Sequence, residues 1–152
     1  MRVGILICHL QQKILPNIRN NNHILKNAHL LISASLQIPN IKQTIISELL
    51  PEKLGRTDGT IVGAVIMNKI NIIPTNNYSV YTPELDEMFQ DYDINNLIIA
   101  GVQTEWCIMK TTKDFIKKKY AVHIPVDAVG TQDVFNQKYG LKRLFQYGAY
   151  PC

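Results

Sequence analysis

The stretch from Asn96 to Cys107 says more about the fold than any other part of the chain. Residues 96–100 form a short and almost wholly apolar run, which is the pattern of a strand buried on both faces of a parallel sheet. Gly101 interrupts the run, and Thr104 can then cap a helix. A helix that begins at the carboxyl end of a buried strand is typical of an open α/β sheet, whose ligands bind at that edge.

Strand-like and helix-like segments alternate along the rest of the chain. Strand patterns cover residues 2–8, 41–46, 61–67 and 121–126. Helix patterns follow Asn20-Asn-Asn22, begin at Thr82-Pro83 and cover residues 133–147, where Gly148 closes the last helix. The alternation predicts an α/β fold with one three-layer α/β/α domain over residues 1–152 and a mostly parallel central sheet.

Composition narrows the class of protein. Hydrophobic residues make up 46% of the 152 residues and charged residues 18%, which is typical of a globular domain. No apolar run is long enough to cross a bilayer, and the first residues resemble a strand more than a signal peptide. Three cysteines without paired spacing do not indicate a disulfide framework. We therefore expect a cytoplasmic protein without a membrane partner.

The net charge of +4 is modest, and its densest piece is Lys117-Lys-Lys119. Such a run could contact nucleic acid. It is more typical of the solvated last turn of a helix, where cations suit the helix dipole. Because no aromatic residues are interleaved with these lysines, the sequence does not favour a nucleic-acid partner.

Candidate catalytic residues lie where strands are predicted to end. His9, Lys69, Cys107 and Asp127 all occupy such positions, and the carboxyl ends of parallel strands meet at one edge of a sheet. Cys107 has two interpretations. A cysteine in the first turn of a helix can be a nucleophile, because backbone N–H groups and the dipole favour the thiolate. Most free cysteines are instead small buried apolar residues.

These residues also resemble a known family. Gly101-Val-Gln-Thr-Glu-Trp-Cys107 is similar to the cysteine segment of the isochorismatase-like cysteine hydrolases, which include nicotinamidases. Asp127-Ala128 resembles the Asp-Ala turn of that family, and Gln11 resembles a glutamine that follows its first strand. The resemblance extends over most of the chain.

Enzymes of that family use an Asp–Lys–Cys triad. The resemblance implies Cys107 as the nucleophile, Lys69 as its electrostatic partner and His9 in place of the aspartate. It also implies a non-proline cis peptide near Val102-Gln103, a small-molecule substrate, a homo-oligomer, no cofactor and no metal. The residues implied for the oxyanion and the substrate are Gln103, Thr104, Trp106 and Gln11.

Departures from the family pattern leave two hypotheses. The triad aspartate is absent, the segment after Lys69 differs from that of the family, and the chain stops at Cys152, short of the last family strand, which the sheet could therefore lack. The first hypothesis is a divergent cysteine hydrolase that acts on a small amide or related C–N bond, with His9 as the base. The second is a catalytically inactive relative that serves binding or assembly.

Overall fold

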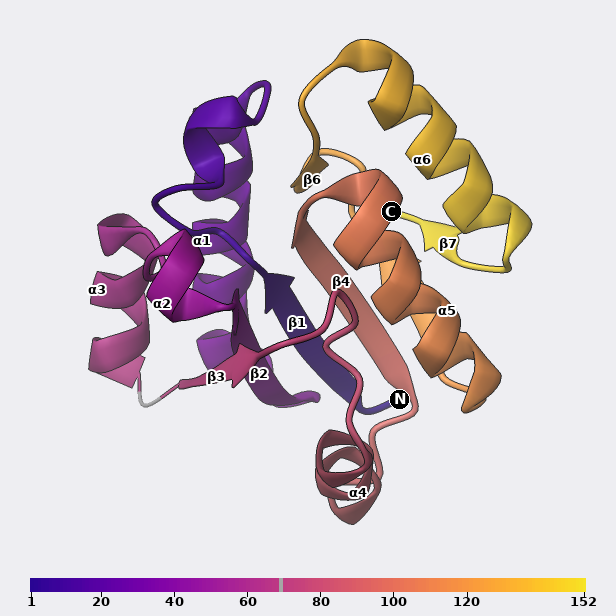
Figure 1. Ribbon diagram of the computed structural model, residues 1–152. Coiled ribbons are helices and arrows are strands. Elements are labelled where there is room, and N and C mark those ends of the chain that lie inside the picture. Colours follow the sequence, from indigo (N-terminus) through magenta and orange to yellow (C-terminus); the bar gives the residue numbers. More distant parts are fainter. Residues whose placement is uncertain (69) are drawn as a thin grey trace.

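The computed structural model describes residues 1–68 and 70–152, and over these residues it contains a central seven-stranded sheet (Figure 1). The strands are β1 (Val3–Cys8), β2 (Ile41–Leu49), β3 (Asn71–Thr75), β4 (Asn96–Val102), β5 (Ala121–Ile124), β6 (Val129–Gly130) and β7 (Tyr150–Pro151). Their order is β3-β2-β1-β4-β5-β7, with β6 paired to β4. Among the described residues, the pairings between these strands are all parallel, so the predicted fold class is confirmed.

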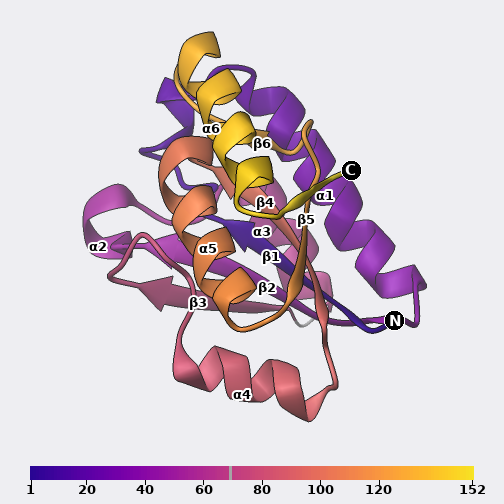
Figure 2. The same cartoon turned by 90° about the vertical axis from the view of Figure 1, so that its right-hand side faces the viewer.

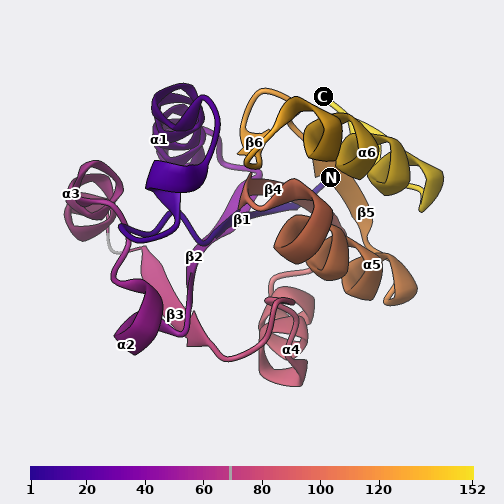
Figure 3. The same cartoon turned by 45° about the horizontal axis from the view of Figure 1, so that its top comes forward.

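Helices cover both faces of the sheet. On one face, α1 (Asn21–Gln37) and α3 (Gly59–Asn68) bury Ile24, Ile32 and Ile61 against β1 and β2. On the other face lie α4 (Pro83–Asp91) and α5 (Met109–Lys117), and α6 (Val134–Gln146) packs beside α5 (Figures 2 and 3). Shorter elements are the helix α2 (Pro51–Leu54) and the turns η1 (Leu15–Asn17) and η2 (Thr104–Ile108).

The carboxyl ends of the inner strands lie level with one another. Cys8 at the end of β1 pairs with Ser47 of β2 and with Gly101 of β4. Gly101 has a φ of +115°, and a Cβ there would overlap the backbone oxygen of Cys8. Glycine is therefore required where β4 passes closest to β1. This arrangement brings the residues that follow β1 and β4 to one edge of the sheet.

The strand expected over residues 61–67 is wrong, because this segment belongs to helix α3. Ile61 and Val65, four residues apart, are buried, whereas Ile66 and Met67 are 73% and 84% exposed. That spacing is helical, and a short apolar run cannot be assigned by periodicity alone. The carboxylate of Asp58 also accepts a hydrogen bond from the N–H of Thr60 at 2.9 Å, as a residue that precedes a helix often does.

Other local predictions agree with the structure. Thr82 caps α4 by accepting a hydrogen bond from the N–H of Leu85 at 3.2 Å, and Asp133 caps α6 in the same way. The chain ends in the two-residue strand β7, which pairs with β5. Over the described residues, no helix combines the length and the apolar character needed to cross a membrane.

Candidate active site

Strand β1 places His9 at the carboxyl edge of the sheet. The backbone of His9 has a φ of 58°, in the left-handed region, and its N–H donates to the carbonyl of Ser47 at 3.0 Å. The side chain is fully buried, and neither ring nitrogen has a hydrogen-bond partner among the described residues. Burial lowers the pKa of the His9 imidazole to about 4, because the charged ring would lose its hydration. His9 is therefore neutral at neutral pH.

Cys107 lies in η2, the π-helical turn that leads from β4 into α5. Its side chain is buried, and this burial raises the pKa of the thiol to about 11. Hydrogen bonds from the backbone N–H groups of Gln103 and Cys107 lower the pKa, whereas the nearby Glu105 carboxylate raises it. The helix start was expected to favour the thiolate, but among the described groups burial outweighs it.

The implied cis peptide is present between Val102 and Gln103. Gln103, and not Thr104 as predicted, occupies the position before the first turn of η2. The hydroxyl of Thr104 donates to Oε1 of Gln137 in α6 at 2.7 Å. Thr104 therefore joins two helical segments, because the buried hydroxyl finds its acceptor on α6 and not on its own turn.

His9, Gln103 and Cys107 share one cavity with a volume of about 260 Å³. Its remaining walls are Lys13, Ile14, Asn17, Leu49, Leu54, Tyr78, Val102 and Gln132. Three of the predicted site residues thus converge, from the ends of β1 and β4. The other residues predicted at the site, Thr104, Trp106, Gln11 and Asp127, do not line this cavity. Trp106 is 57% exposed and lies outside this cavity.

Lys69 lies outside the described residues, so its contact with Cys107 stays a prediction. The reasoning that led to it was wrong in one respect, because the segment before it is a helix and not a strand. Its neighbours Asn68 and Ile70 line a cavity with residues 41–44, at the amino-terminal edge of β2. The strand that runs from there to the catalytic edge is β3, which ends at Thr75 beside Leu49.

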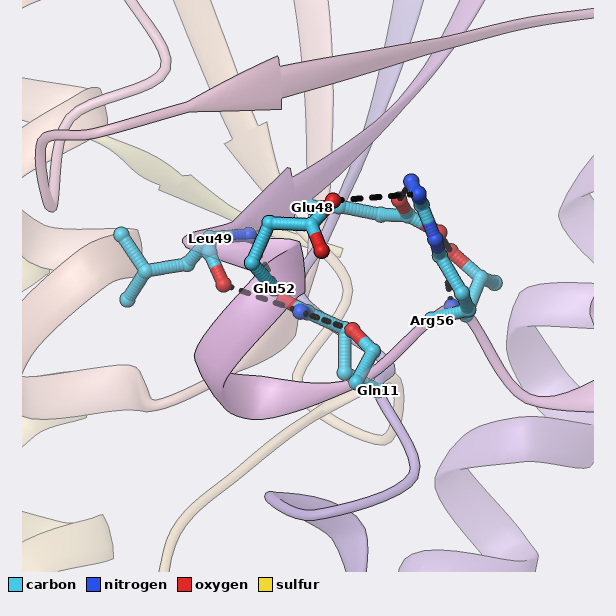
Figure 4. Close-up of polar contacts among 7 residues, drawn as sticks. Gln11, Glu48, Leu49, Glu52 and Arg56 are labelled. Atoms are coloured by element: carbon cyan, nitrogen blue, oxygen red, sulfur yellow. Dashed lines mark hydrogen bonds and ion pairs between the residues drawn. The ribbon is translucent and has the colours of Figure 1, made fainter.

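Gln11 holds the loop that forms one wall of the cavity. Its side-chain nitrogen donates to the carbonyls of Leu49 at 3.0 Å and Gly55 at 2.7 Å, and its oxygen accepts from the N–H of Leu49 at 2.7 Å (Figure 4). The side chain is fully buried. Because these three bonds occupy its amide, Gln11 supports the wall residues Leu49 and Leu54 and does not contact the cavity as the resemblance implied.

A carboxylate reinforces the same loop. Glu48 accepts hydrogen bonds from the N–H of Thr57 at 2.7 Å and from its hydroxyl at 2.8 Å, and it pairs with Arg56 at 3.3 Å (Figure 4). Burial alone would raise the pKa of Glu48, but the hydrogen bonds from Thr57 and the Arg56 guanidinium hold it below its usual value. Glu48 is therefore charged at neutral pH and ties β2 to the start of α3.

Sequence reasoning missed several residues of the cavity. Tyr78 comes from the loop between β3 and α4, and Gln132 from the loop before α6. Neither has a strand-end position that would have singled it out. Lys13 could have been considered from the sequence, because it follows His9 by four residues. Its Nζ donates to the carbonyl of Lys53 at 3.1 Å. These residues are brought to the site only by the tertiary fold.

The sequence is similar to that of known proteins over nearly its whole length. The model of the isochorismatase domain family matches residues 3–152. A relative from Xenopus laevis, isochorismatase domain-containing protein 2, is 30% identical over 149 residues, which cover 96% of this chain and 69% of that protein.

Solved structures are similar over nearly the whole chain. A structure of MAR1 ribonuclease from Caenorhabditis elegans has a TM-score of 0.88 and 27% identity, and the match covers 98% of this chain and 75% of that one. A nicotinamidase/pyrazinamidase, PncA from Bacillus subtilis, has a TM-score of 0.88 at 16% identity over the full length of both chains, a likeness of fold alone. The match of the family model over residues 3–152, together with the Xenopus relative, shows that the chain belongs to the isochorismatase family.

Proposed function

We propose that the protein is a cysteine hydrolase that cleaves a small amide or a related C–N bond, with Cys107 as the nucleophile and His9 as the base. The observation that carries this proposal is the common cavity of about 260 Å³ lined by both side chains and by Gln103. A thiol and a neutral imidazole that line one cavity are the two groups that covalent acyl transfer by a Cys–His pair uses.

The reaction follows from the protonation states. At neutral pH both groups are uncharged, so the Cys107 sulfur attacks the carbonyl carbon while its proton passes to a ring nitrogen of His9. The imidazolium then protonates the leaving amine, and the acyl group stays on sulfur as a thioester. Water, deprotonated by His9, attacks the thioester, and the acid leaves as the proton returns to the sulfur. The N–H groups of Gln103 and Cys107 are the proposed donors to the oxyanion.

The electrostatic role expected for Lys69 is a separate proposal, which the variant Lys69→Gln tests. If Lys69 stabilises the thiolate, this variant slows alkylation of Cys107 by iodoacetamide. We expect the rate in Lys69→Gln to fall, because the ammonium implied beside Cys107 would favour the thiolate. An unchanged rate leaves His9 as the partner of Cys107.

An inactive relative that serves binding or assembly is the second candidate. The observation that favours it is the pair of pKa values at the site: the raised pKa of Cys107 disfavours the thiolate, and the lowered pKa of His9 makes the imidazole a weak base. Both directions follow from burial, and both weaken the nucleophile. The proposed oligomer would then be the functional form.

Intact-mass spectrometry with a panel of small amides tests the choice between the two. A hydrolase should show an acyl adduct on Cys107 and release ammonia, and His9→Ala should slow the reaction at least about a hundredfold. Cys107→Ala should abolish the adduct, whereas Cys152→Ala, at an exposed cysteine, should keep it. No adduct in the natural protein, together with activity in His9→Asp, would establish the inactive candidate.

RNA is tested as a second kind of substrate, because the similar structure from C. elegans bears the name of a ribonuclease. Labelled single-stranded RNA is incubated with the natural protein and with Cys107→Ala. We expect the RNA to stay intact in both. Cleavage that disappears in Cys107→Ala would replace the amide by RNA as the substrate of this site.

A further inference from the structure

A second and larger cavity adjoins the one that contains Cys107. Its volume is about 530 Å³, and Tyr78 stands in the wall of both cavities. We call the larger one the outer groove; its walls are Asn77, Tyr78, Ser79, Tyr81, Glu105, Trp106, Met109, Lys110, Lys113 and Asp114. Trp106 is also the chain neighbour of Cys107. A ligand that extends beyond the cavity of Cys107 past Tyr78 therefore enters the outer groove.

Two aromatic side chains of the outer groove are left largely exposed. Trp106 is 57% exposed and Tyr78 is 59% exposed. Their ring centroids lie 6.1 Å apart, with the planes tilted by 44°. Large rings gain stability when they are removed from water, and exposed Trp and Tyr side chains that lie together are typical of surfaces that bind a ligand. Met109 adds a flexible apolar contact beside them.

Three charged side chains of the outer groove, Lys110, Lys113 and Asp114, have partners within the protein. Nζ of Lys110 lies 3.4 Å from the carboxylate of Asp114. Nζ of Lys113 donates to the hydroxyl of Tyr147 at 3.3 Å and lies over its ring. Oε1 of Glu105 accepts a hydrogen bond from Thr131 at 2.7 Å, and its buried Oε2 has no hydrogen-bond partner among the described residues. The negative charge of Glu105 repels an anion, so this pattern favours an uncharged ligand over an anionic one.

We propose that the outer groove is a subsite for a neutral aromatic group of the substrate, which packs against Tyr78 and Trp106 while the bond to be cleaved enters the cavity of His9 and Cys107. This inference rests on the proposed function for the nature of that bond. The substrate class is therefore an aromatic amide whose ring and carboxamide are joined by a short linker.

Trp106 provides a direct readout of binding, because it is the single tryptophan of the chain. Fluorescence titrations are made in Cys107→Ala, which separates binding from turnover. Phenylpropanamide should change the tryptophan emission and saturate, whereas propanamide, which lacks the ring, should not. Phenylpropanoate and phenylpropylamine should bind more weakly than the neutral amide. Equal responses to the two amides, or tighter binding of either ion, would overturn the proposal.

Variants locate the binding. Tyr78→Ala in the Cys107→Ala background should raise the Kd of phenylpropanamide about tenfold, whereas Tyr78→Phe, which keeps the ring, should leave it within about twofold. Phe135→Ala is the matched control, because Phe135 is 77% exposed and lines neither cavity. Circular dichroism checks the fold of each variant, and Tyr78→Leu replaces Tyr78→Ala if the latter does not fold. An equal Kd in the Tyr78 and Phe135 variants would refute the subsite.

Turnover separates this inference from the proposed function. If Cys107 hydrolyses amides, Tyr78→Ala should raise the ratio of KM for phenylpropanamide to KM for propanamide about tenfold. Saturable binding without turnover retains the subsite and rejects the hydrolase. Turnover of both amides with the same KM rejects the subsite and retains the hydrolase.

Discussion

Replacing Gln11 with leucine should destabilise the protein strongly, although the Gln11 side chain hydrogen-bonds to Leu49 and Gly55 and not to His9 or Cys107. The carboxamide makes two buried hydrogen bonds to Leu49 and one partly buried hydrogen bond to Gly55. Leucine has a similar volume but no polar atom. The variant therefore removes the hydrogen bonds and leaves backbone groups of the loop without partners, with little change in packing.

The expected loss is worked from those three bonds. Each buried hydrogen bond contributes about 1 kcal/mol net, and each backbone group left unpaired costs about 1 to 3 kcal/mol. Water can reach part of the loop and satisfy some of these groups. We therefore expect a decrease of about 3 to 4 kcal/mol in the free energy of unfolding, against a total of about 5 to 15 kcal/mol for a typical domain.

Urea unfolding followed by circular dichroism measures this loss. Gln12→Ala is the matched control, because Gln12 is the exposed neighbour, and its free energy of unfolding should change by no more than about 0.5 kcal/mol. Gln11→Glu should also be destabilised, since a carboxylate cannot donate to the carbonyls of Leu49 and Gly55. A loss below about 1 kcal/mol in Gln11→Leu would refute the role of Gln11 as the support of the loop.

Three further predictions concern the site and its frame. Alkylation of Cys107 by iodoacetamide should stay slow at neutral pH and should accelerate as the pH rises toward about 11, because burial raises the pKa of this thiol; fast labelling at neutral pH would contradict this. The pKa of Glu48 is lowered in the folded protein, so its charge should stabilise the fold above about pH 4.3, which is the pKa of a glutamate in an unfolded chain. This contribution should be lost as the pH falls through the folded pKa. Glu48→Gln should therefore make the free energy of unfolding, measured in urea, less dependent on pH in acid. Gly101→Ala should cost more than about 3 kcal/mol in thermal unfolding, because alanine would combine a positive φ with an overlap onto Cys8, whereas Gly63→Ala, where a Cβ meets nothing, should cost little.

The fold could be predicted from the sequence where local pattern and tertiary position agree. The apolar run of β4 and the cap at Thr82 each have a local physical cause, and the structure confirms both. The strand does not end at Gly101 as expected, because β4 continues to Val102 and Gly101 pairs with Cys8 and Val129. The helix α3 could not be recognised in this way. Its apolar residues fit either a buried strand or a buried helix, and the choice is made by the packing of Ile61 and Val65 with the other residues of that face.

The site was predictable only in part, because some of its residues are brought there by tertiary packing and not by a local pattern. His9 and Cys107 follow strands that the pattern identified, so their convergence could be foreseen from the parallel sheet. Tyr78 reaches the cavity from a loop, and loops leave no periodic signal in a sequence. For Gln11 the resemblance identified a position and not the atoms that its side chain contacts, which are backbone groups of Leu49 and Gly55.

The left-handed backbone at His9 has a consequence for how this site can change. Histidine, asparagine and aspartate tolerate a positive φ much better than branched or bulky residues do. A φ of 58° therefore favours glycine and small polar side chains at this position over branched ones. An imidazole and a carboxylate can replace each other there without any movement of the main chain. A single codon change could thus exchange one proton carrier for the other, while the geometry around the sulfur stays as it is.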